Sequence, residues 1–135
     1  MLLNAAACLV VGVGRYEHVT LVLHGVLHWL PVPQRIQFKI AVSAFDCVRD
    51  HCLAYFNNVY TPVTGISGRA NLRSAERCYM RVPSTRTQLC RRSFHVAAPA
   101  VWNALPSQLR SSSISRGQFR AGLKTHLFTQ AYEDL

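Results

Sequence analysis

The sequence predicts a mainly α-helical protein with one short β-hairpin, and an α+β arrangement is the alternative. Apolar residues recur at steps of three and four near both ends of the chain, whereas only a short middle stretch alternates like a strand. Half of the 135 residues are hydrophobic, so pervasive disorder is not expected. A chain of this length forms one domain with a modest core.

Three helices that pack as a small bundle are expected in the N-terminal part, residues 1–54. The first covers residues 4–11 and ends at two glycines, and the second covers residues 21–29, with Thr20 as its N-cap. Pro33 opens the third helix. The apolar positions of this third helix are Phe38, Ala41, Phe45, Val48 and Cys52.

Turn-forming residues mark residues 55–71 as a linker between this part and residues 72–135. The second part is expected to contain a basic hairpin, a tryptophan corner and an amphipathic helix, and both parts belong to one domain. Strand-like alternation at residues 78–82 and 93–96, separated by the polar residues 84–87, predicts the hairpin.

The corner covers residues 92–110, where Pro99 and Pro106 are each expected to begin a short helix. Trp102 and Leu105 then share a face. A capping box of Ser115 and Gln118 starts the last helix. The expected structural anchors of the whole chain are Trp29, Pro99, Trp102, Pro106, Phe119, Leu123 and Leu127.

Positive charge is the main functional signal. Fifteen Lys and Arg against six Asp and Glu give a formal charge of +9, which favours polyanionic partners. Residues 69–92 hold seven arginines and one acid, so RNA or single-stranded DNA is the expected ligand, and a solvated basic face is the alternative. The candidate nucleic-acid-binding residues are Arg69, Arg73, Arg77, Arg81, Arg86, Arg91, Arg92 and Tyr79.

Catalytic residues, metal ligands and cofactor motifs are not predicted. His24 and His28 have the i, i+4 spacing of zinc ligands, as do Cys47 and His51, but no third ligand is indicated for either pair. The five cysteines include no C-x-x-C pair, which favours reduced thiols in an intracellular protein. No nucleophile is spaced with a base, and the glycines form no phosphate loop.

The apolar N-terminal stretch, residues 1–14, lacks the positively charged start of a signal peptide and is too short to span a bilayer. We therefore expect a nuclear or cytoplasmic protein, neither secreted nor associated with a membrane.

Four sequence blocks resemble one family. Residues 94–106 read FHVAAPAVWNALP and residues 27–36 read LHWLPVPQRI, which are similar to blocks near the C-terminus of the endonuclease and reverse transcriptase polyprotein of vertebrate LINE-type (non-LTR, jockey-like) retrotransposons. Residues 4–7 and 123–128 resemble further blocks in the same order. The resemblance implies a retrotransposon-derived tail whose partners are the element's nucleic acids and the upstream reverse transcriptase domains.

The polymerase chemistry of that family is not expected here. It requires adjacent aspartates that hold two divalent metals, and none of Asp46, Asp50 and Asp134 is adjacent to another. The sequence therefore predicts a fragment that is not an enzyme, with weak, non-specific RNA or single-stranded DNA binding. The alternatives are a protein-interaction module, in which Trp29, Trp102 and the residue 119–127 face dock onto a larger protein, and a remnant without a selected function.

Overall fold

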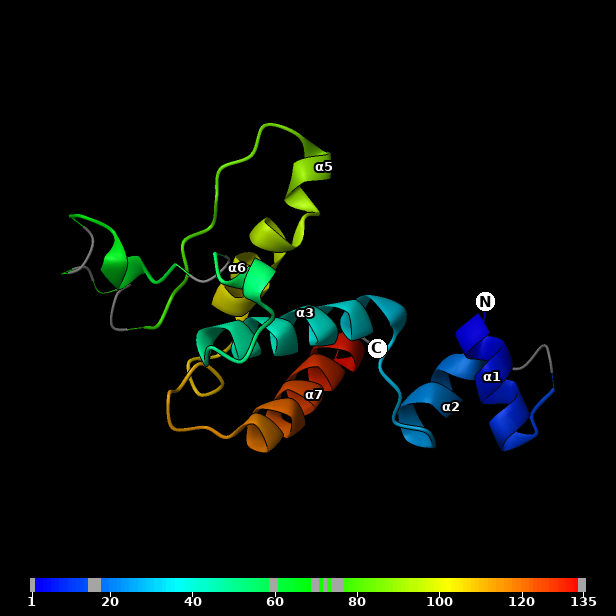
Figure 1. Ribbon diagram of the computed structural model, residues 1–135. Coiled ribbons are helices and arrows are strands. Elements are labelled where there is room, and N and C mark those ends of the chain that lie inside the picture. Colours follow the sequence, from blue (N-terminus) through cyan, green and yellow to red (C-terminus); the bar gives the residue numbers. More distant parts are fainter. Residues whose placement is uncertain are drawn as a thin grey trace.

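The computed structural model describes residues 2–14, 18–58, 61–68, 71, 73 and 77–133, and the chain is mainly helical there, as predicted (Figure 1). The α-helices are α1 (Leu2–Val11), α2 (Val19–Gly25), α3 (Val32–Val48), α5 (Gln88–Arg91), α6 (Phe94–Ala104) and α7 (Arg116–Tyr132). Two short 3-10 helices follow α3: η1 (Ala54–Phe56) begins one residue before the segment predicted as a linker, and η2 (Val63–Gly65) lies within it.

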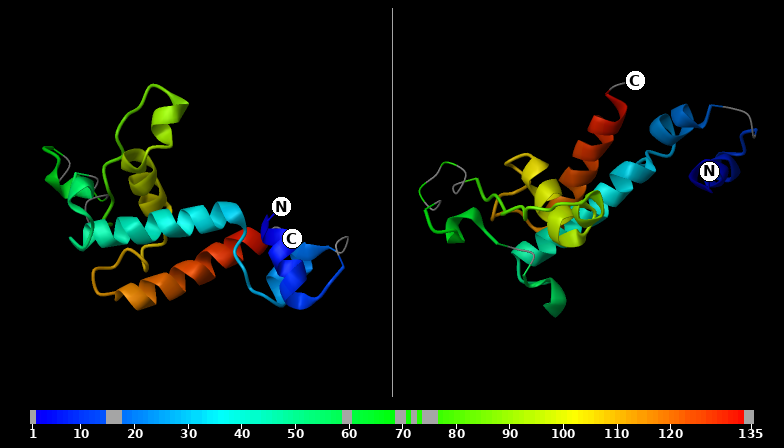
Figure 2. Two further views of the ribbon diagram at one scale, coloured as in Figure 1. Left: turned by 45° about the vertical axis from the view of Figure 1, so that its right-hand side comes forward. Right: turned by 90° about the horizontal axis from the view of Figure 1, so that it is seen from above.

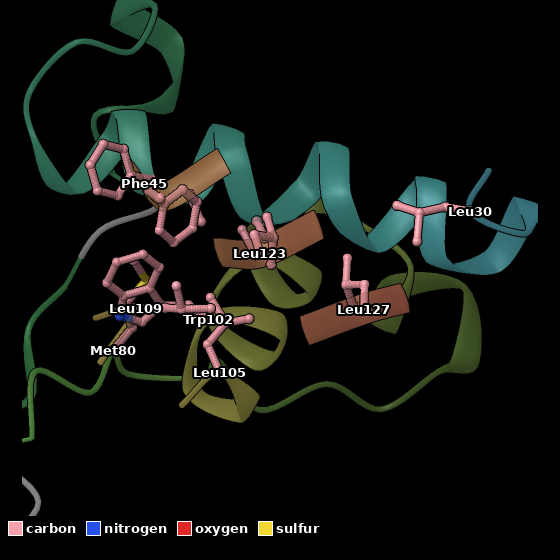
Figure 3. Close-up of a cluster of buried hydrophobic side chains, with 12 residues drawn as sticks. Leu30, Phe45, Met80, Trp102, Leu105, Leu109, Leu123 and Leu127 are labelled. Atoms are coloured by element: carbon pink, nitrogen blue, oxygen red, sulfur yellow. The ribbon is translucent and has the colours of Figure 1, made fainter. Parts of the chain in front are cut away.

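The core lies between α3, α6 and α7. Helix α7 runs antiparallel to α3, and α6 packs across α3 in each view (Figure 2). Phe45 of α3 stacks on Phe119 of α7 with ring centroids 4.4 Å apart, and Trp102 of α6 lies beside both rings. The expected anchors Trp102, Phe119, Leu123 and Leu127 are all buried in this cluster, as Figure 3 shows for three of them.

The predicted bundle of three N-terminal helices is wrong. Helices α1 and α2 pack on each other at one end of the α3–α7 pair, and α6 and α7 cover the apolar face of α3 (Figures 1 and 2). The buried residue of α1 is the small Ala7, while Leu2 and Leu9 stay more than four-fifths exposed. Large side chains that fill a core gain most by burial, and here α6 and α7 supply them.

The boundaries of α2 also differ from the prediction. Its N-cap is His18 instead of Thr20, and the helix ends at Gly25 instead of residue 29. His28 has a positive φ of 51°, a conformation that no helix continues through. Residues 28–30 therefore form an irregular connection to Pro31, the N-cap of α3, which places Pro33 in the first turn as expected.

The predicted β-hairpin is not present, because its second strand, residues 93–96, is part of a helix. Ser93 is the N-cap of α6, and the following alanine-rich sequence favours a helix over three residues of alternation. Pro99 consequently lies inside α6 and does not open it, and the described residues contain no strand. Residues 77–81 still pair once, through an isolated antiparallel bridge between Pro62 and Met80.

After α6 the chain turns twice before α7. Pro106 starts a turn, in which the Leu109 N–H donates to its carbonyl at 3.0 Å, instead of the helix that was predicted. The capping box that begins α7 is confirmed: the Ser115 N–H donates to Gln118 Oε1 at 3.0 Å, and the Gln118 N–H donates to Ser115 Oγ at 3.3 Å.

Two arginines fix the start of α7 against the end of α3. Arg49 donates to the carbonyls of Ser111 and Ile114 at 3.3 and 3.0 Å. Arg116 makes a forked ion pair with Asp46, at 2.8 and 3.1 Å. These contacts join residues more than sixty positions apart, so they tie the C-terminal end of α3 to the start of α7.

Candidate nucleic-acid interface

Side chains at the C-terminal end of α6 hydrogen-bond the backbone of residues 78–80. The Trp102 indole Nε1–H donates to the Cys78 carbonyl at 3.0 Å. The Asn103 side chain bonds both backbone groups of Met80: its Oδ1 accepts from the Met80 N–H, and its Nδ2 donates to the Met80 carbonyl, each at 2.8 Å. One amide side chain thus takes the place of a neighbouring strand for Met80, which is 2% exposed.

Arg110 holds the same segment from the other side. Its guanidinium donates from Nε to the Leu105 carbonyl at 3.1 Å and from Nη1 to the Arg77 carbonyl at 2.6 Å. The guanidinium also lies 4.3 Å from the centre of the Tyr79 ring. Because Arg110 is 6% exposed and engaged in these contacts, it is a structural cation and not a surface for phosphate.

Residues 61–63 contact the same segment, residues 77–81, through two backbone hydrogen bonds. The Val63 N–H donates to the Tyr79 carbonyl at 3.1 Å, and the Arg81 N–H donates to the Thr61 carbonyl at 2.8 Å. Residues 77–81 therefore lie between residues 61–63 and α6, with their backbone fixed. Arg77 and Arg81, whose side chains are exposed, project from this fixed backbone.

Arg86, Arg91 and Arg92 are exposed on the next segment, around α5. Thr87 caps α5 by accepting from the Cys90 N–H at 3.2 Å, and α5 contacts α6. Of the remaining predicted binding residues, Arg73 is exposed and Arg69 lies outside the described residues. The sequence from residue 77 to residue 110 contains no acidic residue, so no carboxylate within it neutralises these arginines.

The aromatic side chains of the basic segment are occupied by the protein itself. The half-buried Tyr79 ring carries Arg110 over its face, and the Phe94 ring packs on Phe56 at 4.6 Å between centroids. Hydrogen bonding to Arg77 and then to Arg110 lowers the pKa of the Tyr79 phenol. This surface is thus suited to contact phosphates, and the face of Tyr79 that Arg110 covers is not open to base stacking.

Of the two pairs considered as metal sites, the histidine pair packs on α7, and in the other pair Cys47 is buried while His51 is exposed. The His24 and His28 rings both stack on Phe128 of α7, at 5.2 and 5.8 Å between centroids. Cys47 is buried, and desolvation raises the pKa of its thiol to about 12. Within the part of the chain that the structure describes, three or more potential metal ligands do not gather anywhere.

The sequence analysis did not identify Asn103 and Arg110 as structural supports of residues 77–80. Both are polar residues next to buried apolar positions. The side chains of such residues generally hydrogen-bond backbone N–H or C=O groups that have no partner in a helix or sheet. That signal was available at Asn103, which directly follows the anchor Trp102.

Comparison of the chain with protein-family models, with curated proteins and with solved structures finds no match. Among the described residues, every helix is too short or too polar to cross a bilayer.

Proposed function

We propose that this chain binds RNA or single-stranded DNA weakly and without sequence preference, through the phosphate groups. The supporting observation is the set of exposed arginines at residues 77–92, a stretch without acidic residues that we call the arginine segment. Its first residues, 77–80, are fixed to the core by Trp102, Asn103 and Arg110. Arginine forms forked bonds to phosphate oxygens, and an anchored backbone reduces the entropy lost when these side chains bind.

The number of arginines sets the expected salt dependence. Arg77, Arg81, Arg86, Arg91 and Arg92 can neutralise up to five phosphates. Counterion release from a single strand then gives a slope of log K against log salt of about −3.5, or about a 100-fold loss of affinity between 50 and 200 mM salt.

The test is fluorescence anisotropy with labelled single-stranded RNA and DNA across a salt series. Replacing Arg86, Arg91 and Arg92 with alanine should reduce affinity and bring the slope to about −1.4, because three phosphate contacts are lost. The matched control replaces the same three residues with lysine, which keeps the charge and should keep most of the slope. Binding with an unchanged slope in the alanine variant would contradict the proposal.

The family resemblance extends this proposal. The chain would be the non-catalytic tail of a LINE-type reverse transcriptase polyprotein, and the upstream polymerase domains would be its natural partners. Asp46 is held by Arg116, which agrees with a structural role for this carboxylate. We accordingly expect no primer extension by the isolated chain when template, primer, nucleotides and Mg²⁺ are supplied.

A second candidate, a protein-interaction module, is favoured by apolar exposure on α1 and α2. Leu2, Leu9, Leu21 and Val26 are 89, 84, 75 and 61% exposed. Trp102 and the Phe119–Leu127 face are buried in the protein's own core, so the interacting surface would be α1–α2 instead. Such a surface predicts self-association at micromolar concentration, and a monodisperse monomer in light scattering would count against it.

A further inference from the structure

A small cavity between the α2–α3 connection and α7 combines aromatic walls with positive charge. Its volume is about 200 Å³, and its walls include Trp29, Leu30, Phe38, Arg35 and Lys124. The cavity is remote in sequence from residues 77–92, and none of its lining residues belongs to the arginine segment.

The walls of this cavity are fixed by contacts within the protein. The Trp29 N–H donates to the Leu23 carbonyl at 2.9 Å, and the Trp29 carbonyl accepts from the Tyr132 hydroxyl at 2.9 Å. Arg35 donates from Nε to the Leu30 carbonyl at 2.9 Å, and its guanidinium lies 5.5 Å from the centre of the Trp29 ring. The site is therefore formed before a ligand arrives.

The charged side chains that line the cavity are cations. Arg35 and Lys124 line it, and the Arg120 guanidinium lies 5.9 Å from the Phe38 ring on its wall. Neither residues 18–45 nor the sequence of α7 contains an acid. A ligand here needs an apolar or aromatic group to enter the cavity and negative charge outside it.

The size of the cavity selects among such ligands. Sites for whole cofactors or drug-sized molecules measure about 300–1,000 Å³, so this cavity accommodates one ring and little more. A polyanion that inserts a single ring and lays its remaining charge over the neighbouring cations satisfies both conditions.

We propose that this cavity is a base-binding site, which takes one base of a single-stranded nucleic acid beside Trp29 and Phe38 while Lys124 holds a flanking phosphate. Arg35, which donates to the Leu30 carbonyl and lies over the Trp29 ring, keeps that ring in position. The inference takes its ligand class from the proposed function but rests on a different set of residues. It adds base contact to a protein whose arginine segment offers phosphate contact.

Trp29 is the natural reporter, because it is partly exposed at the cavity, whereas Trp102 is 1% exposed in the core. A 12-residue oligothymidylate should quench the tryptophan emission of the full chain, and an abasic oligonucleotide of the same length should not. In a Trp29→Phe variant the quenching should disappear while anisotropy still reports binding. Equal quenching by the abasic strand, or quenching that survives Trp29→Phe, would overturn the base-binding site.

The Lys124→Gln variant tests the proposed phosphate contact, since this exposed side chain can be changed without disturbing the core. It should weaken the quenching-detected Kd by about two- to fivefold, the size of one exposed charge contact. Lys39→Gln is the matched control: it removes the same charge from α3 without lining the cavity. An equal effect of both variants would refute a specific role for Lys124.

The two proposals fail separately. If wild-type protein binds by anisotropy with the expected salt slope but shows no base-dependent quenching, only the base-binding site is wrong. If quenching occurs but the Arg86, Arg91 and Arg92 alanine variant keeps the full salt slope, the arginine segment is wrong and the cavity stands.

Discussion

Replacing Asn103 with alanine would show whether one side chain fixes residues 77–81, the start of the arginine segment. The change removes two hydrogen bonds of 2.8 Å and leaves the N–H and C=O of Met80, a residue that is 2% exposed, without their partners. Each buried group left unsatisfied costs about 1–3 kcal/mol. Water can enter the space left by the amide and recover part of this, so we expect a loss of about 2 kcal/mol.

The loss should appear first as local opening. Amide hydrogen exchange measured by NMR should show the Met80 N–H exchanging about 30-fold faster, the factor that corresponds to 2 kcal/mol. Core amides such as that of Leu123 in α7 should change much less if residues 77–81 open alone. Nucleic-acid affinity should fall modestly, because Arg77 and Arg81 lose their fixed backbone.

Asn58→Ala is the control, since Asn58 is an exposed asparagine in the segment after η1. It should leave Met80 exchange and urea unfolding unchanged. The reasoning is refuted if Met80 exchange is the same in Asn103→Ala as in wild type. It is also refuted if Leu123 and Met80 accelerate equally, because residues 77–81 would then not open separately from the core.

Three further predictions concern stability. Trp102→Ala should lower the free energy of unfolding by about 3–5 kcal/mol in urea titrations followed by circular dichroism, and a negligible change would exclude its anchoring role. Gly117→Ala should be neutral or slightly stabilising. Gly122→Ala in the same helix should be less stable than Gly117→Ala, because the new Cβ of residue 122 would lie 2.8 Å from Leu109 Cδ2. Equal unfolding free energies of the two variants would contradict this packing. The pKa of the Cys47 thiol is raised to about 12, so the thiol ionises in the unfolded state at a lower pH than in the folded state. The free energy of unfolding of wild type should therefore exceed that of Cys47→Ala by less at pH 10 than at pH 8. A difference that stays constant over this pH range would contradict the prediction.

Local signals in the sequence were sufficient for α7. Its capping box and apolar face are properties of adjacent residues, and the structure confirms them. The partner of α3 was not predictable in that way, because periodicity shows that a face is apolar but not which distant helix covers it. Proximity in sequence favoured α1 and α2, whereas side-chain volume favoured α6 and α7.

The hairpin failed for a related reason. Residues 93–96 alternate over too few positions to specify a strand, and Ser93 as N-cap with the alanines that follow specifies a helix. The arginines of the candidate interface were predicted from composition alone, since exposed charge needs no tertiary information. Asn103 and Arg110 were not, because their roles depend on backbone carbonyls and amides more than twenty residues away.

The order of the helices also affects how the chain emerges from the ribosome. Ala41, Ala44 and Phe45 of α3 are covered by α6 and α7, and α7 ends at Tyr132, 84 residues after Val48. At about 5–20 residues per second, synthesis of these residues takes about 4–17 s. Until α6 is synthesised, the apolar face of α3 has no partner within the chain, and until α7 is complete only α6 can cover it. Nascent chains that stall between α3 and α7 should therefore be bound by chaperones.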